Sequence, residues 1–374
     1  MRLALAAAAF AFAAAVQAQA PQAPAVAARA WLLADLASDQ VLVAHRADER
    51  VEPASLTKLM SAYLVFGAMR EGRLAADQQV EISARAWRAP GARSFLEPGS
   101  RVSVDTLLRG LVVQSGNDAA IALAEALAGT EAQFVAQMNE EAGRLGLAAT
   151  RFANATGLPH PQHYSSARDL ARLAEALIRD FPGEYARYYS QKEFGHNDIV
   201  QLNRNRLLWL DPSVDGVKTG YTATAGYCLI ASAERGGRRL LSVVLGADSE
   251  AARARESLRL LNWGFRHFDG VRLYAAGEAV REVEVWKGAL AAVKAGFLRG
   301  LVITVPRGEA AKLAAELVTH PPVLAPVAKG DKVGVLRVAL EGRPVGEYAV
   351  VALEAVPQAG WLGRAWDTLR LWFR

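Results

Sequence analysis

The stretch Pro53-Ala54-Ser55-Leu56-Thr57-Lys58 opens a segment whose apolar residues recur with helical spacing as far as residue 70. The i,i+3 spacing places the Ser55 hydroxyl and the Lys58 amine on one face of that helix, one turn apart. A serine hydroxyl is a weak nucleophile that needs a nearby base. A lysine can act as that base when burial and a neighbouring cation lower its pKa. The stretch therefore predicts a nucleophile–base pair, although Ser-x-x-Lys alone is also typical of an N-cap serine followed by an exposed lysine.

Two more short motifs follow along the chain. Ser115-Gly116-Asn117 lies between apolar segments, and we interpret it as a loop whose hydroxyl and amide point into a cleft; alone, it would also suit a helix boundary. Lys218-Thr219-Gly220 enters a strand-like segment, and an edge strand here would pair with an extended peptide substrate. Lys218 would supply a second cation near Lys58, Thr219 would bind a carboxylate and Gly220 would leave room for substrate. A basic turn before a strand is the plainer alternative.

The three motifs in this order form the signature set of penicillin-binding proteins and serine β-lactamases. Each motif also falls in its required context, which is a helix start, an inter-helix loop and a strand. Longer stretches resemble the low-molecular-mass D-Ala-D-Ala carboxypeptidases, and the similarity covers essentially the whole mature chain. These stretches are Glu52-Pro53-Ala54-Ser55-Leu56-Thr57-Lys58-Leu59-Met60, Ser115-Gly116-Asn117-Asp118-Ala119, Ser165-Ser166-Ala167-Arg168-Asp169, Gln201-Leu202-Asn203-Arg204-Asn205 and Val214-Asp215-Gly216-Val217-Lys218-Thr219-Gly220-Tyr221-Thr222.

The resemblance implies an α+β fold with three parts. A penicillin-binding/β-lactamase-like transpeptidase domain, with an antiparallel sheet and a helical insertion, would span residues 29–268. A small all-β domain would follow at residues 271–356, and an amphipathic helix at residues 357–374. We therefore expect all the chemistry to lie in the first part.

The same resemblance implies roles for individual residues. The implied catalytic residues are Ser55 as acylated nucleophile, Lys58 as base and Ser115 as proton shuttle. The implied substrate-binding residues are Asn117, Lys218, Thr219, Gly220, Tyr221 and Arg253, and the last of these would help to bind the terminal carboxylate. Backbone N–H groups of Ser55 and Tyr221 would form the oxyanion hole. Several relatives carry histidine at position 221; because only the backbone is needed there, we expect this departure to affect substrate tuning more than activity.

Periodicity outside the motifs predicts the rest of the first domain. Residues 31–36 and 41–45 are predicted to form a hairpin, and residues 101–144 are predicted to be rich in helix. A helix is predicted over 167–179, capped by Ser165 or Ser166. The remaining predicted elements are strands at 226–233 and 239–246, joined through Gly236-Gly237, and a helix at 253–268.

After residue 270 the pattern changes to short strand-like runs. They fall near residues 283–285 and at 301–305, 333–340 and 348–353, with a turn expected at Glu341-Gly342. Residues 309–317 have helical propensity and form the one exception. We interpret this part as a β-rich domain without chemistry of its own.

Both ends of the chain carry targeting patterns. Residues 1–20 combine Arg2, an apolar run and a small-x-small cleavage site, which is typical of a secretory signal peptide. No later segment reaches the ~20 apolar residues needed to span a bilayer. Residues 361–374 place three Trp and one Phe on one face and three Arg on the other, which favours a helix lying in the lipid interface over one docked on its own domain. We therefore expect an exported, peripheral protein on the periplasmic side of the cytoplasmic (inner) membrane.

Composition excludes other classes of function. The net charge is only +5 and no dense Lys/Arg run occurs, so we expect no nucleic-acid partner. The single cysteine, Cys228, lies in an apolar run and is interpreted as a small core residue. The six histidines form no H-E-x-x-H pattern, and His160 and His163 are assigned to a surface loop. We therefore predict no metal and no cofactor.

The activity implied by the resemblance is that of a serine-type D-Ala-D-Ala carboxypeptidase. Ser55 would attack the D-Ala-D-Ala bond of peptidoglycan pentapeptides, the last D-alanine would leave, and water would hydrolyse the acyl-enzyme; β-lactams would acylate the same serine. A DD-endopeptidase acting on cross-links would use the same residues and differ in cleft shape. A β-lactamase is disfavoured because no Glu-x-x-Leu-Asn segment is found and an extra domain is present. A non-catalytic wall-binding protein would show damage to at least one motif, and none is damaged.

Overall fold

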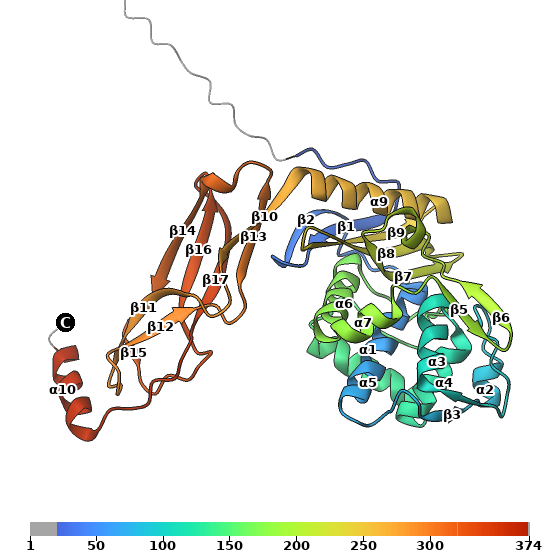
Figure 1. Ribbon diagram of the computed structural model, residues 1–374, viewed down its shortest axis with the longest axis horizontal. Coiled ribbons are helices and arrows are strands. Elements are labelled where there is room, and N and C mark those ends of the chain that lie inside the picture. Colours follow the sequence, from blue (N-terminus) through green and yellow to red (C-terminus); the bar gives the residue numbers. More distant parts are fainter. Residues whose placement is uncertain (1–20, 320, 373–374) are drawn as a thin grey trace, which may run out of the picture.

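The computed structural model describes residues 21–319 and 321–372. The predicted signal peptide and the last two residues of the predicted C-terminal helix lie outside the described residues. In sequence order, a sheet with helices on both faces comes first, then a β-rich part, and then a last helix at the far end of that part (Figure 1). The α+β architecture expected from the sequence is confirmed.

The central sheet has five antiparallel strands in the order β2-β1-β9-β8-β7. Its strands are β1 (Ala30–Asp35), β2 (Gln40–His45), β7 (Val214–Thr222), β8 (Gly226–Arg235) and β9 (Arg238–Ala247). The predicted hairpins are confirmed, and Gly236 and Gly237 both take positive φ in the two-residue turn between β8 and β9. Strand β7, which carries the Lys-Thr-Gly motif, is an edge strand with one free side.

One face of the sheet is covered by a helical insertion that encloses a large alanine- and leucine-rich core. The short 3-10 helix η1 (Ala54–Thr57) leads into α1 (Lys58–Arg70), which runs through the middle of this layer (Figure 1). The other helices of the layer are α2 (Ala84–Trp87), α3 (Val104–Arg109), the π-helical turn η2 (Gly110–Gln114), α4 (Asn117–Ala128), α5 (Glu131–Arg144), α6 (Ala167–Asp180), α7 (Pro182–Tyr188) and α8 (Leu207–Leu210). Two small two-stranded sheets accompany them, β3 (Gln79–Glu81) with β4 (Arg101–Ser103) and β5 (Glu193–His196) with β6 (Ile199–Leu202).

Serine caps set the start of two helices that frame the sheet. Ser166 caps α6 by accepting a hydrogen bond from the Asp169 N–H, as predicted. Helix α9 (Glu250–His267) packs on the opposite face of the sheet and begins three residues earlier than predicted, because Ser249 caps it. This earlier start brings Glu250 into the first turn of the helix.

The β-rich part consists of a two-stranded and a six-stranded sheet around a valine-rich core. The first sheet pairs β10 (Phe268–Tyr274) with β13 (Leu301–Pro306), and the second has the order β14-β16-β17-β12-β11-β15. The second sheet contains β11 (Ala279–Trp286), β12 (Ala292–Gly296), β14 (Leu313–Thr319), β15 (Val323–Leu324), β16 (Lys332–Leu340) and β17 (Arg343–Ala352). The predicted turn at Glu341-Gly342 joins β16 to β17, with positive φ at both residues.

The helix predicted over 309–317 is wrong. Only a 3-10 turn η3 (Ala310–Lys312) forms there, and β14 follows. All seven residues of β14 pair with β16. Helical propensity differs between such residues by only a few tenths of a kcal/mol, so pairing along a whole neighbouring strand overrides it.

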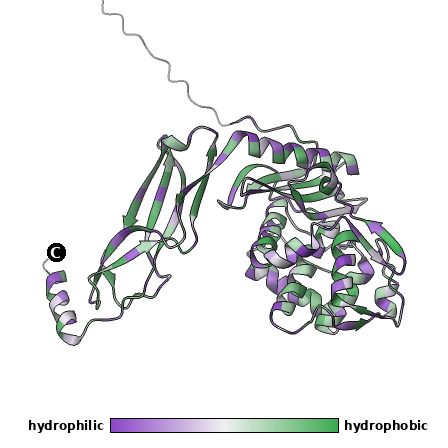
Figure 2. Ribbon diagram, viewed as in Figure 1, coloured by the Kyte–Doolittle hydropathy of each residue, from purple (hydrophilic) through white to green (hydrophobic). Residues whose placement is uncertain are grey.

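The chain ends in the helix α10 (Trp361–Trp372), which carries both hydrophobic and hydrophilic residues along its length (Figure 2). Five of its large apolar side chains are exposed: Trp361, Leu362, Trp366, Leu369 and Trp372 have between 53% and 86% of their surface accessible, while Leu371 is half-buried. No single helix among the described residues is long and apolar enough to cross a membrane; the bent pair α4–α5 meets that test only by length and composition.

Candidate active site

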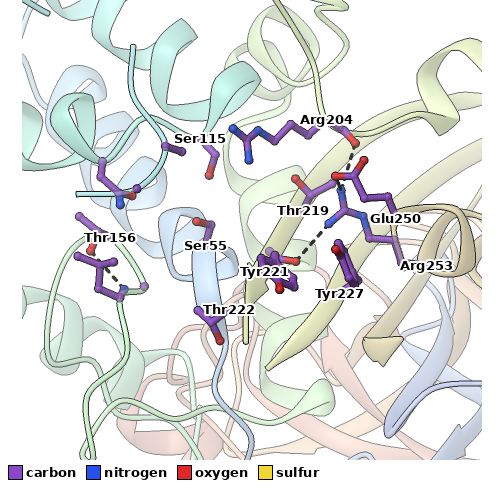
Figure 3. Close-up of a pocket in the computed structure, with 16 residues that line it drawn as sticks. Ser55, Ser115, Thr156, Arg204, Thr219, Tyr221, Thr222, Tyr227, Glu250 and Arg253 are labelled. Carbon is purple, nitrogen blue, oxygen red and sulfur yellow. Dashed lines mark hydrogen bonds and ion pairs between the residues drawn. The ribbon is translucent and has the colours of Figure 1, made fainter. Parts of the chain in front are cut away.

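A cavity of about 430 Å³ opens where the helical layer meets the edge strand β7 (Figure 3). Seven of the nine predicted site residues line it: Ser55, Ser115, Asn117, Thr219, Gly220, Tyr221 and Arg253. The other two, Lys58 and Lys218, are buried next to lining residues. Three motifs separated by up to about 160 residues of sequence thus meet at one site.

The Lys58 amine lies at the centre of a compact hydrogen-bond network. Its Nζ donates to Ser55 Oγ at 3.0 Å, to Asn117 Oδ1 at 2.6 Å and to the Thr156 carbonyl at 2.6 Å. The orientation of the Asn117 amide is fixed, because its Nδ2 donates to the Pro90 carbonyl at 2.6 Å. Two of the three contacts of Lys58 are therefore with oxygens that can only accept.

Burial changes the proton affinity of both lysines. Burial, together with the nearby cation Arg204, lowers the pKa of Lys58 from 10.5 to about 7, against a smaller opposing effect of Asp118. Burial and the charges of Lys58, Arg204 and Arg253 hold the pKa of Lys218 well below its usual value. Arg204 is thus a cation near Lys58 that the sequence did not single out, and Lys218 interacts with Lys58 as a second nearby cation.

The second motif is held in place by a strained turn. Ser115 follows the π-helical turn η2 and takes a left-handed conformation with φ of 68°. This turn points its hydroxyl into the cavity (Figure 3), where it is buried and makes no hydrogen bond to any described residue. A buried hydroxyl without a partner costs free energy unless a ligand satisfies it. Ser115 is thus available to substrate.

The third motif brings β7 against η1. A Cβ on Gly220 would lie 3.2 Å from the Pro53 carbonyl oxygen and 3.3 Å from the Ser55 nitrogen. Gly220 therefore leaves room for the protein's own backbone beside Ser55, whereas the sequence suggested that the room is for substrate. Next to it, Tyr221 is half exposed at the cavity rim, with its ring 4.4 Å from that of Tyr227.

Three charged residues from two elements gather at one end of the cavity. Arg253 of α9 is buried and donates to the carbonyls of Gly220 and Arg204 at 3.3 and 3.5 Å. Its Nη2 also forms an ion pair with Glu250 at 3.1 Å (Figure 3). Arg204 and Glu250 were not predicted as site residues. Arg204 lies within Gln201-Leu202-Asn203-Arg204-Asn205, one of the stretches that resemble the carboxypeptidases. Nothing in the sequence around Glu250 indicates that this residue belongs to a site.

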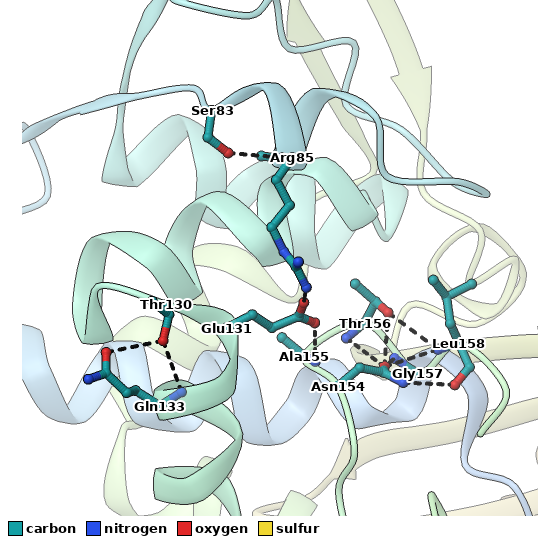
Figure 4. A network of polar contacts seen from close by, with 11 residues as sticks. Ser83, Arg85, Thr130, Glu131, Gln133, Asn154, Ala155, Thr156, Gly157 and Leu158 are labelled. Atoms are coloured by element: carbon teal, nitrogen blue, oxygen red, sulfur yellow. Dashed lines mark hydrogen bonds and ion pairs between the residues drawn. The ribbon is translucent and has the colours of Figure 1, made fainter. Parts of the chain in front are cut away.

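Thr156, Gly157 and Leu158 line another side of the cavity, and a network of polar contacts holds the loop that carries them (Figure 4). Glu131, at the start of α5, accepts from the Ala155 N–H at 3.0 Å and pairs with Arg85. Asn154 Oδ1 accepts from the Gly157 N–H at 2.7 Å and from the neighbouring N–H groups of Thr156 and Leu158. This network fixes the Thr156 carbonyl against Lys58.

The assignment of His163 to the surface is wrong. His163 is buried: its Nδ1 accepts from the Ala153 N–H at 3.2 Å, and its Nε2 lies 2.8 Å from Thr57 Oγ1. Because Nδ1 accepts, the proton is on Nε2 and is donated to Thr57. Burial, together with the neighbouring His160, lowers the pKa of His163 to about 4, so the ring is neutral near neutral pH. The ring joins the loop before residue 154 to the Ser-x-x-Lys motif.

This geometry agrees with comparisons to known proteins. The model of the family described as D-alanyl-D-alanine carboxypeptidase (peptidase S11) matches residues 17–249. The chain belongs to the D-alanyl-D-alanine carboxypeptidase family. A second model, the C-terminal domain of penicillin-binding protein 5, matches residues 268–358. The carboxypeptidase function and the fold expected from the sequence are thereby confirmed.

Individual members of this carboxypeptidase family are similar over most of their length. The chain is 43% identical to the D-alanyl-D-alanine carboxypeptidase DacC of Escherichia coli, over 94% of this chain and 90% of that one. The structure of penicillin-binding protein 5 from Haemophilus influenzae aligns with a TM-score of 0.85 at 38% identity, covering 90% and 99%. Penicillin-binding protein D2 from Listeria monocytogenes, in its ampicillin-bound form, aligns with a TM-score of 0.60 at 32% identity, covering 65% and 99%.

In the part of the chain that the structure describes, neither the single cysteine nor the arrangement of potential metal ligands indicates a thiol-dependent or metal-dependent site. Cys228 is buried and its pKa is raised to about 11 by burial, so the thiol stays protonated and acts as a core residue, as predicted. Among the described residues, no three His, Cys, Asp or Glu side chains gather in a way that would hold a metal ion.

Proposed function

We propose that this carboxypeptidase cleaves peptidoglycan peptides ending in D-Ala-D-Ala through an acyl-enzyme at Ser55, with Lys58 as the base. The observation that carries the proposal is the contact of 3.0 Å between Lys58 Nζ and Ser55 Oγ, at a lysine whose pKa is lowered to about 7. Near neutral pH such an amine is therefore present in its unprotonated form. A serine with a neutral amine at hydrogen-bond distance meets the requirement for an activated nucleophile.

The hydrogen-bond partners of the neutral Lys58 amine set the direction of its lone pair. A neutral amine keeps two N–H groups, and Asn117 Oδ1 and the Thr156 carbonyl are acceptors only. When those two oxygens accept hydrogen bonds from the two N–H groups, the lone pair of Lys58 Nζ points toward Ser55 Oγ. The Ser55 proton then moves to Lys58 Nζ as Oγ attacks the scissile carbonyl carbon. Ser115, the unpartnered hydroxyl in the cavity, is assigned to relay this proton from Lys58 to the leaving amine, which returns Lys58 to its neutral form.

The oxyanion and the terminal carboxylate are assigned to opposite sides of Gly220. The backbone N–H groups of Ser55 and Tyr221 would stabilise the oxyanion, because Gly220 allows β7 to approach η1 closely. Thr219 and Arg253 would bind the terminal carboxylate, while Asn117 and Lys218 hold the peptide and tune the site. The same groups would receive a β-lactam, as the ampicillin-bound relative suggests.

Replacing Arg253 by alanine tests this assignment. We expect kcat/KM to fall by about 10- to 100-fold for a peptide ending in a free carboxylate, because a charge-assisted hydrogen bond contributes about 1.5–3 kcal/mol. The same peptide with an amidated end should lose much less. The comparison needs steady-state release of D-alanine or D-alaninamide from the two peptides. Equal losses on both would show that Arg253 has a structural role only.

We further propose that the protein is exported and attached to the periplasmic face of the cytoplasmic membrane through α10. The polar side of α10 contacts the β-rich part: Asp367 accepts from the Lys287 N–H at 2.6 Å, and Arg370 lies over the Trp286 ring at 5.5 Å. Its tryptophans face away, and Trp372 is 86% exposed. A helix docked for its own stability would bury that apolar face. The opposite orientation suits insertion into a lipid interface.

Deleting residues 360–374 should move the enzyme from the membrane fraction to the soluble periplasmic fraction. Cleavage of peptide by the purified truncated protein should be unchanged, because α10 lies at the far end of the β-rich part (Figure 1). Fractionation followed by immunodetection gives the distribution, and thermal unfolding shows that the remainder is folded. A truncated protein that still pellets with membranes would contradict the anchor.

A further inference from the structure

The carboxylate of Glu250 lies where a substrate carboxylate is expected to bind. It lines the cavity and pairs with Arg253 Nη2 at 3.1 Å, on the first turn of α9 (Figure 3). We propose that Glu250 is a specificity-determining residue that occupies Arg253 in the free enzyme and competes with the terminal carboxylate of the substrate. The inference rests on the carboxylate-binding role assigned to Arg253 under the proposed function.

The two partners of this ion pair differ sharply in exposure. The Arg253 side chain is 4% exposed, whereas that of Glu250 is 55% exposed. A buried guanidinium without a counter-charge is costly, so the free enzyme gains from keeping Glu250 beside it. Releasing Glu250 to water costs little, because more than half of its side chain is already exposed. The exposed acid is therefore the member of the pair that a ligand can displace.

Neutral groups hold Arg253 in position without Glu250. The carbonyls of Gly220 and Arg204 accept from its two terminal nitrogens, and the guanidinium lies 5.6 Å from the centre of the Tyr227 ring. These contacts come from β7, the segment before α8, and β8, so they fix the guanidinium from three sides. Removing the charge of Glu250 should leave Arg253 pointing into the cavity.

Competition for Arg253 has a defined consequence for the reaction. The ion pair between Glu250 and Arg253 stabilises the free enzyme but is absent from the complex in which substrate binds Arg253. Substrate must therefore break this pair in order to bind, and an enzyme without Glu250 does not have that cost. A second carboxylate on the same guanidinium also repels the substrate carboxylate. When Glu250 is present, both effects weaken the binding of peptides that end in a free carboxylate. The binding of peptides with a neutral end does not change.

The test compares Glu250→Gln and Glu250→Ala with wild type on matched peptides ending in D-Ala-D-Ala and in D-Ala-D-alaninamide. We expect KM for the free acid to fall about two- to fivefold in both variants, as for a partly exposed ion pair, with kcat changed less than about twofold and the amide unaffected. Glu71→Gln, which removes a charge from an exposed pair with Arg73, is the matched control. A KM for the free acid that stays constant or rises in Glu250→Gln would overturn the proposal.

The Arg253→Ala variant separates this proposal from the one on which it rests. On that background Glu250→Gln should have no further effect on KM, because the two substitutions act on one interaction. If Arg253→Ala harms acid and amide equally, the role of Arg253 itself is wrong. If Arg253→Ala is selective for the acid but Glu250→Gln leaves KM unchanged, only the competition by Glu250 is wrong.

Discussion

Replacing Lys58 by arginine is expected to lower the rate of acylation by penicillin about 10²- to 10⁴-fold, the usual contribution of a general base. Burial and Arg204 bring the pKa of Lys58 to about 7, so an amine is available near neutral pH. A guanidinium stays protonated throughout this range and offers no lone pair to Ser55. Stopped-flow or quenched labelling with a fluorescent penicillin gives the rate directly.

Two controls keep the Lys58 experiment interpretable. Because arginine is larger and the site is buried, Lys58→Gln should be measured beside it, with circular dichroism and thermal unfolding to show that both variants fold. In wild type the acylation rate should rise with pH through about 7, since the neutral amine forms above the pKa of Lys58 and is lost below it. Near-normal acylation by a folded Lys58→Arg protein would exclude Lys58 as the base.

Replacing Ser55 by alanine should abolish release of D-alanine from diacetyl-Lys-D-Ala-D-Ala. Loss of a nucleophile that acts as a unit with its base costs several orders of magnitude, roughly 10⁴-fold or more in kcat. The fold should survive, because Lys58 keeps its hydrogen bonds to Asn117 and to the Thr156 carbonyl. Ser100→Ala, which removes a hydroxyl bonded to the Glu97 carbonyl on the surface, is the matched control and should keep full activity. Turnover by Ser55→Ala above about one per cent of wild type would contradict the mechanism.

The sequence was most informative where the chemistry depends on short, local patterns. Spacing within Ser55-x-x-Lys58 placed a lysine amine next to a serine hydroxyl, and the pattern around Lys218-Thr219-Gly220 indicated an edge strand; the structure has both features. Such motifs can be recognised because backbone geometry alone brings their members together. The expected hairpins and the cap at Ser166 follow from the same local rules.

The sequence failed where a role depends on distant contacts. His163 reaches Thr57 across 106 residues and Glu131 reaches Ala155 across 24, and neither has a local signature of burial. Arg204 lowers the pKa of Lys58 only because the fold brings it close. The wrong helix at 309–317 has the same origin, since β16 decides that segment rather than its own propensity. Tertiary contacts, not local pattern, set these features.

The position of the covalent adduct formed with benzylpenicillin tests the central claim most directly. Intact-mass analysis of the wild-type protein should show a single added penicilloyl group, and peptide mapping should place it on the peptide that contains Ser55. Ser55 lines the cavity with its hydroxyl 3.0 Å from Lys58 Nζ, whereas Ser115 lacks such a contact. One adduct on Ser55 is the predicted result; an adduct on Ser115 or on any other residue, or none at all, would contradict the account.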